Sequence, residues 1–291
     1  MSEFLEHLRK DVRLCRSDSL YLLFVLIVTV MAFVMSFVST SSYVSQWPSL
    51  LTTEAELLER QRSNLNAYWL MISNSLLIVF VLISSMTITA EKESGMVRYV
   101  LTHRTRSWSM YLSKYLILAC LAIYAVAVSS LAYYLVFTVM DLALLNAGDI
   151  FSAMVLPMMV VLTFCAIGLM VSALVNKKGA AIALGVVLFL GISMSFTMVV
   201  SMANEAAYDH PDWEWGLDEI DYMPGYFKAL IKMNPMVLIS GTEFLAEGEG
   251  ALIGLGMIAV YLALGMIFFA RERTEFGLLK DLQLRFRGRD R

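Results

Sequence analysis

Six long apolar stretches, separated by short charged segments, dominate the pattern of hydrophobic and polar residues along the chain. They cover roughly residues 20–38, 68–89, 115–140, 150–174, 180–203 and 251–270. A helix needs about 20 mainly apolar residues to cross a bilayer, and each stretch is close to or above that length. Charged residues make up only 16% of the chain, whereas a soluble domain has about 25%. The pattern predicts an all-α integral membrane protein with six transmembrane helices.

An amphipathic pattern precedes the first apolar stretch. Over residues 2–18, the side chains of Phe4, Leu8 and Val12 recur at helical spacing and form one apolar stripe, and most basic residues lie elsewhere around the helix. Such a helix lies in the membrane interface, with its basic side chains near anionic lipid head groups. The simpler alternative is a charged flank that only orients the first span. We predict the in-plane helix, within residues 1–19.

The basic residues are distributed unevenly between the connecting segments. If both termini are cytoplasmic, 18 of the 22 Lys and Arg residues lie inside, in segments 1–19, 90–114, 175–179 and 271–291. The outer segments then hold 15 of the 25 acidic residues. Cytoplasmic loops of membrane proteins carry an excess of Lys and Arg. The sequence therefore predicts a multi-pass protein of the plasma (cytoplasmic) membrane with both termini inside and a basic cytoplasmic tail, 271–291.

The segments on the predicted outer side carry further local signals. Residues 54–62 are expected to form a short helix ahead of the second span. The segment 202–250 is a large extracytoplasmic loop, and its moderately apolar part, 226–246, is expected to form one or two short helices at the outer leaflet. Pro157 has no N–H to donate and should kink the fourth span. Gly168 permits a close approach of neighbouring helices.

The chain lacks the motifs that catalysis or metal binding would require. No G-x-x-x-x-G-K-[ST] phosphate loop is present, so the chain cannot bind ATP by that route. No charged residue falls within the six stretches, which counts against an ion-coupled carrier, because such carriers usually hold the driving ion at an ionisable side chain. We expect neither an enzyme nor a metal protein, and no cofactor bound by this chain.

Polar side chains inside the spans are mainly hydroxyls. Groups of this kind bond to the backbone or to neighbouring helices more often than to a substrate. The candidates for a translocation path are one amide and four hydroxyls: Ser73, Asn74, Ser129, Ser193 and Thr197.

The segment 90–114 contains the most informative local pattern. A polar turn with Glu91, Glu93 and Gly95 follows the second span, and a short amphipathic helix comes next. Its apolar side carries Val97, Val100 and Leu101, its polar side carries Arg98, and Ser107 can cap the helix that follows. A short surface helix with exposed apolar residues suits a groove on a soluble partner.

The order of these features resembles the membrane subunits of ABC transporters of the ABC-2 (type-2 exporter-like) family. Those subunits share the in-plane "elbow" helix, six spans, an acidic, Gly-containing turn with a coupling helix after span two, a Lys leading into span three, and an Asn-Pro before the last span. Here the Lys is Lys114 and the Asn-Pro is Asn234-Pro235. The resemblance covers essentially the whole chain. One departure is Thr102-His103-Arg104, where the family often has a Pro after the coupling helix.

The resemblance implies a permease subunit that works by alternating access, with export favoured over import. It implies a separate ABC ATPase subunit, which would bind ATP and Mg, a second permease copy or a close relative as dimer partner, and contact with lipid but not with nucleic acid. ATPase coupling would fall to Glu91, Glu93, Gly95, Val97, Arg98, Val100 and Leu101. A secondary carrier or channel, and a non-transporting scaffold or sensor with an outer binding loop, remain open alternatives. A neighbouring gene for a P-loop ATPase would favour the permease.

Overall fold

The computed structural model of the chain is helical throughout the residues that it describes. It describes the backbone of residues 2–17, 19–45, 54–95, 97, 107–140, 142, 145–208, 210, 219–246 and 248–287. The long helices are α2 (Ser19–Ser45), α3 (Glu54–Glu93), α5 (Ser107–Val139), α7 (Val155–Leu174), α8 (Lys178–Tyr208) and α12 (Glu249–Arg287). The shorter ones are α1 (Ser2–Ser17), α6 (Ala147–Ala153), α9 (Glu219–Tyr222), α10 (Gly225–Lys232), α11 (Val237–Ser240) and the 3-10 helix η1 (Thr242–Phe244).

Six helices in this part of the chain are long and apolar enough to cross a membrane. They comprise the five long helices α2, α3, α5, α8 and α12, and the pair α6 and α7 taken together. The predicted all-α fold with six spans is thus confirmed.

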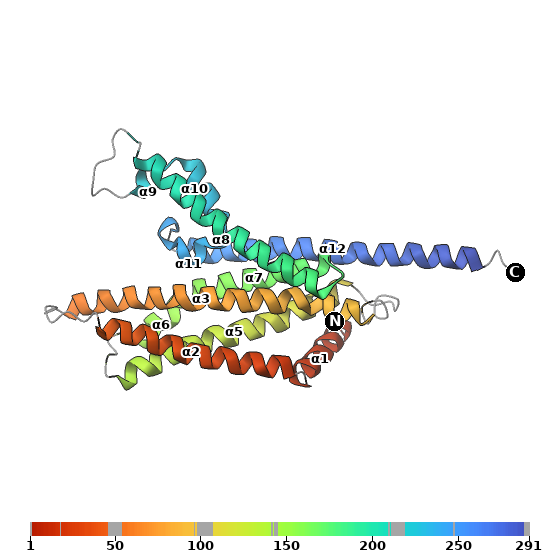
Figure 1. Cartoon of the computed structure of the whole chain (residues 1–291), viewed down its shortest axis with the longest axis horizontal. Coiled ribbons are helices and arrows are strands. Elements are labelled where there is room, and N and C mark those ends of the chain that lie inside the picture. The colour runs from red at the N-terminus through yellow and green to blue at the C-terminus, as the bar shows by residue number, and fades with distance from the viewer. Residues whose placement is uncertain are drawn as a thin grey trace.

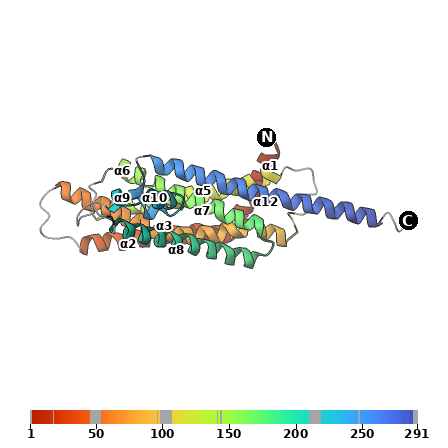
Figure 2. The ribbon, with the colours of Figure 1, turned by 90° about the horizontal axis from the view of Figure 1, so that it is seen from above.

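The spans pack around α7. Helix α7 lies against both α3 and α12, α5 lies against α2 and α7, and α8 packs on α3 and also contacts α7. Figure 1 shows α3 along the middle of the bundle, with α2 and α5 on one side and α8 and α12 on the other. Figure 2 shows the same helices running along one common direction. Helices α3 and α7 are the most buried spans, and α8 is the least buried.

Small residues bring α3 and α7 into close contact. A Cβ atom at Gly168 would collide with the Ser84 side chain and would lie 3.2 Å from the backbone nitrogen of Ser85. One turn further along, the Ser172 hydroxyl of α7 accepts hydrogen bonds from the backbone N–H groups of Ile88 (2.8 Å) and Thr89 (3.0 Å). The predicted close approach at Gly168 is therefore confirmed, because no larger side chain fits between the helices.

Different elements lie at the two ends of the bundle. The "α1 end" holds α1, the last turn of α3, the first turn of α5 and the connection between α7 and α8, and the "α10 end" holds α6, α9, α10 and the start of α3 (Figure 1). Helix α12 continues beyond the other helices at the α1 end. The sequence predicts that the α1 end is cytoplasmic.

Two of the long helices extend past the apolar stretches that predict them, because nothing in the sequence stops the helices there. Residues 54–62 do not form a separate helix but the first turns of α3, whose 40 residues make it about 60 Å long. Helix α12 likewise continues to Arg287, into the predicted tail 271–291, whose cytoplasmic position stays a prediction. Both regions lack Pro, so the backbone hydrogen bonding of the span continues past its apolar part.

The fourth span is interrupted near its beginning. It divides at Met154 into α6 and α7, three residues before Pro157. Proline cannot donate to the carbonyl four residues earlier and its ring crowds that turn. The predicted kink is thus a break one turn earlier, which leaves Pro157 in the first turn of α7, where proline is tolerated.

The large loop 202–250 is partly helical and returns along the bundle. Helix α8 extends to Tyr208, and α10, α11 and η1 occupy the part where one or two short helices are predicted. The Asn234 side-chain amide donates to the Ile192 carbonyl (3.0 Å) and to the Ser195 hydroxyl (3.1 Å), both in the middle of α8. The turn at Asn234-Pro235 therefore lies well inside the length of the bundle. Residues 211–218 of this loop, which include Asp212, Glu214 and Asp218, lie outside the described residues.

Candidate functional site

Three consecutive side chains at the end of α3 contact three different helices. Glu91 Oε1 lies 2.6 Å from Lys114 Nζ on α5. Lys92 Nζ donates to the carbonyl oxygens of Ala173 (2.7 Å) and Val175 (3.3 Å) at the end of α7. Glu93 Oε1 accepts a hydrogen bond of 2.6 Å from the backbone N–H of Lys178, where α8 begins. Successive side chains on an α-helix point about 100° apart, so one short charged run reaches all three neighbours.

The contacts of Lys92 and Glu93 match the charges of the helix ends that they meet. The last carbonyls of a helix carry partial negative charge and lack helical partners, and a lysine can supply donors to them. The first N–H groups carry partial positive charge and suit a carboxylate in the same way. The connection between α7 and α8 is therefore fixed on both sides to the end of α3. We call Glu91, Lys92 and Glu93 the "α3 clamp".

A buried acidic residue of α1 completes the polar cluster. Asp11 Oδ1 lies 2.6 Å from Lys114 Nζ, and Asp11 Oδ2 accepts a hydrogen bond of 2.7 Å from the Ser113 hydroxyl. The side chains of Asp11, Lys114 and Glu91 are only 4%, 8% and 12% exposed. Lys114 therefore joins α1, α3 and α5 through one ammonium group.

Sequence analysis missed Asp11 because it assigned a purely apolar role to the inner face of α1. The sequence does hold one signal for Asp11, because it follows Leu8 by three residues and so lies next to the predicted apolar stripe on the helix. In the structure Phe4 and Leu8 are half-buried, Val12 is 52% exposed, and Asp11 is the buried residue among the α1 side chains that the structure describes. Helix α1 is confirmed as a helix, and its in-plane position in the membrane stays a prediction.

The turn after α3 has the geometry that its glycine allows. The Ser94 N–H donates to the Ala90 carbonyl (3.2 Å), the Gly95 N–H donates to the Lys92 carbonyl (3.0 Å), and Gly95 has φ of 75°. A left-handed residue after the last helical turn is a common helix ending, and Gly adopts it without steric cost. The chain thus leaves the α3 clamp at a defined angle.

One residue of the predicted docking surface faces the protein itself. Val97 is 1% exposed and belongs to the hydrophobic core of this chain. Its side chain is therefore packed within this chain, and its role in ATPase coupling stays a prediction. Arg98, Val100 and Leu101 lie outside the described residues.

The five predicted path residues do not form one site. Asn74, Ser193 and Thr197 gather at a cavity of about 440 Å³ between α3, α8 and α11, which we call the "α8 groove". Its other lining residues are Phe189, Phe196, Val200, Met236 and Ser240. Ser73 is buried beside it on α3. Ser129 lies away from the groove on α5, where its hydroxyl donates to the Ala125 carbonyl and its own carbonyl accepts from the Tyr68 hydroxyl.

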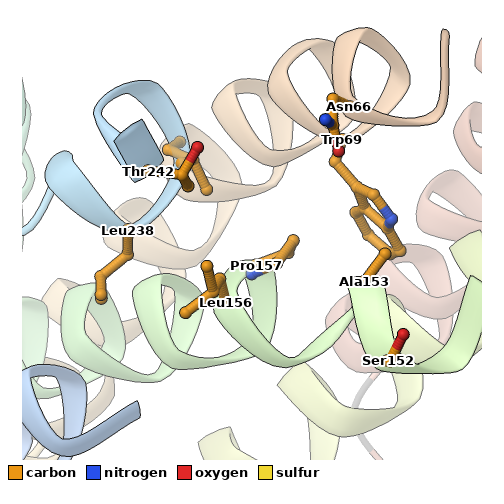
Figure 3. A pocket seen from close by; sticks show the side chains of 9 residues that line it. Asn66, Trp69, Ser152, Ala153, Leu156, Pro157, Leu238 and Thr242 are labelled. Atoms are coloured by element: carbon orange, nitrogen blue, oxygen red, sulfur yellow. The ribbon is translucent and has the colours of Figure 1, made fainter. Parts of the chain in front are cut away.

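A second cavity of about 190 Å³ lies between α3, the α6–α7 break and α11. Figure 3 shows Trp69 reaching from α3 toward Ala153, with Pro157 and Leu156 on α7 and Leu238 on the opposite side. Helix α11 therefore borders both cavities, with Met236 and Ser240 lining the α8 groove and Leu238 and Ile239 lining the second cavity. Among the described residues, no charged side chain lines either cavity.

Comparison with known families gives one match. The model of a family described as "ABC-2 family transporter protein" matches residues 7–273. The match includes Asp11, the α3 clamp, both cavities and all six spans. No curated protein matches the chain.

Proposed function

The chain belongs to the ABC-2 transporter family, and we propose that it is the permease subunit of an ATP-driven exporter. A separate ATPase subunit, which binds ATP and Mg²⁺, docks on the cytoplasmic segment 94–106 after α3. A second copy of the permease, or a close relative, forms the other half of the transporter. Lipid covers the apolar side chains that this pairing leaves exposed.

The observation that supports this proposal most strongly is the α3 clamp. An ATPase acts on a permease only if a movement of the docking segment reaches the spans. Here the residues directly before that segment bind α5, the end of α7 and the start of α8 at 2.6 to 2.7 Å. A displacement of the turn therefore moves three spans together, in the manner of rigid helices that shift as packed units.

The α8 groove is the part of the translocation path that this proposal assigns to the described residues. Its volume of about 440 Å³ falls in the range of about 300–1,000 Å³ that small-molecule sites occupy. Phe189 and Phe196 supply apolar surface, and Asn74 and Thr197 supply hydrogen-bonding groups. Alternating access would open this groove to each side of the membrane in turn, driven by the clamp.

The proposal is tested by co-purification from mild detergent. A tagged permease should retain an ATPase subunit with a P-loop, and Val100→Asp with Leu101→Asp should abolish that association, because a charge in a desolvated contact is strongly unfavourable. The matched control is Tyr226→Asp with Met233→Asp, two exposed apolar residues of the α10 end. Loss of the ATPase in the first variant alone supports docking at segment 94–106. Wild-type retention in an inserted Val100–Leu101 variant contradicts it.

A further inference from the structure

Lys114 is shared by two carboxylates, one with both of its oxygens in polar contacts and the other with only one. Asp11 has both oxygens engaged, one by Lys114 and one by the Ser113 hydroxyl. Glu91 uses only Oε1, which lies 2.6 Å from Lys114 and 3.9 Å from Lys10. Glu91 Oε2 is buried and accepts no hydrogen bond in the part of the chain that the structure describes. Asp11 is therefore the fully bonded carboxylate and Glu91 the incompletely bonded one.

A second cation, Lys10, lies near Glu91, with its Nζ 3.9 Å from Glu91 Oε1. The Lys10 side chain is 31% exposed, against 8% for Lys114, so Lys10 lies at the rim of the cluster and Lys114 inside it. A carboxylate that moves outward with the turn would exchange a buried lysine for a more exposed one. Lys114 would stay paired, because Asp11 holds it from α1. Without Asp11, the same movement would leave a buried, unpaired ammonium group, which is strongly unfavourable.

We propose that the Asp11–Lys114 pair is a permanent contact and that the Lys114–Glu91 contact is the one that opens when the turn after α3 moves. Asp11 is then a positioning residue. It holds Lys114 in place and keeps its ammonium group in an ion pair while the Glu91 carboxylate moves from Lys114 to Lys10. The N-terminal helix α1 thereby sets how easily the turn moves. The link to ATP rests on the proposed function, whereas the opening of the contact is a property of the permease alone.

Two isosteric variants separate this role from a merely structural one. Asp11→Asn and Glu91→Gln each remove one negative charge from the same lysine. If the pair only stabilises the fold, both variants loosen the turn. If Asp11 allows Glu91 to leave, Asp11→Asn makes opening harder, because Lys114 would lose its last carboxylate, and Glu91→Gln makes opening easier.

Hydrogen–deuterium exchange of the peptide around residues 90–97 in the purified full-length permease measures this opening directly. We expect exchange to be slower in Asp11→Asn and faster in Glu91→Gln, each by about tenfold, the change that ~1.4 kcal/mol in opening free energy produces. Asp11→Glu should restore exchange toward the wild-type rate. Glu249→Gln, which removes the partner of Lys232 at the α10 end (2.8 Å), is the matched control and should leave this peptide unchanged.

Faster exchange in both Asp11→Asn and Glu91→Gln would overturn the proposal, as would an unchanged rate in both. If Asp11→Asn fails to fold, Lys10→Gln decides in its place. The proposal requires slower exchange, because Glu91 loses the lysine to which it would move, whereas faster or unchanged exchange would contradict it. Because these measurements need no ATPase, they stand even if no ATPase associates with the chain, and association is read separately by co-purification.

Discussion

Glu93 of α3 accepts a hydrogen bond of 2.6 Å from the backbone N–H of Lys178, at the first residue of α8. This contact joins segments 85 residues apart in the sequence and ties the end of the second span to the start of the fifth. Together with the hydrogen bonds from Lys92 to the end of α7, it fixes the α7–α8 connection to the segment where we propose that the ATPase docks.

Removal of the clamp should uncouple the ATPase without releasing it. In Lys92→Ala with Glu93→Ala, the turn loses its contacts to α7 and α8 but keeps its own surface. We expect the complex to assemble at wild-type level and its ATP-dependent movement of α8 to be largely lost. Co-purification and site-directed labelling of α8 measure the two properties. Arg60→Ala with Arg62→Ala, at the opposite end, should alter neither, and loss of assembly in the clamp variant would contradict its assigned role.

On α1, Asp11 should matter far more than its neighbour Val12. Removing one partner of a buried ion pair typically costs about 3–5 kcal/mol, and Asp11 is 4% exposed, whereas Val12 is 52% exposed. Thermal unfolding in detergent should therefore show a large decrease in midpoint for Asp11→Ala and little change for Val12→Ala. Equal effects would mean that α1 is held mainly by its apolar stripe.

Gly168 should tolerate no side chain. Alanine there collides with Ser84, and overpacking of this kind usually costs about 1–3 kcal/mol. Gly191→Ala is the control, because a Cβ atom at that position meets nothing within 4 Å. Detergent stability should fall for Gly168→Ala only, and Gly168→Ala with Ser84→Gly should recover it. If the double variant does not recover stability, the loss in Gly168→Ala does not come from the contact with Ser84.

The predicted orientation can be checked at residues that the structure leaves exposed. In a background without Cys15, Cys120 and Cys165, single cysteines at Arg62 and Glu243 should react with an impermeant maleimide in intact cells. Cysteines at Ser94 and Lys177 should react only after permeabilisation. Labelling of Ser94→Cys in intact cells would reverse the orientation and remove the docking segment from the side where ATP is available.

The spans could be predicted from sequence because length and apolarity are local properties. Ser107 as the start of α5, and Gly95 as the turn after α3, follow equally from local rules of capping and backbone freedom. The partner of Lys114 could not be predicted, since Asp11 lies 103 residues away and only the packing of α1 on α5 brings them together. The packing of Val97 within this chain could not be predicted for a similar reason, because an apolar stripe does not show which residues will cover it.

The most direct test of the account follows the groove while the ATPase is at work. In the purified complex, the maleimide labelling rate of Thr197→Cys, which lies in the α8 groove, is measured with and without ATP and vanadate. We expect a several-fold change on nucleotide trapping in the otherwise wild-type complex and none in the variant with Lys92→Ala and Glu93→Ala. A rate that nucleotide does not alter, or an equal change in the clamp variant, would contradict the claim that ATP moves the spans through the end of α3.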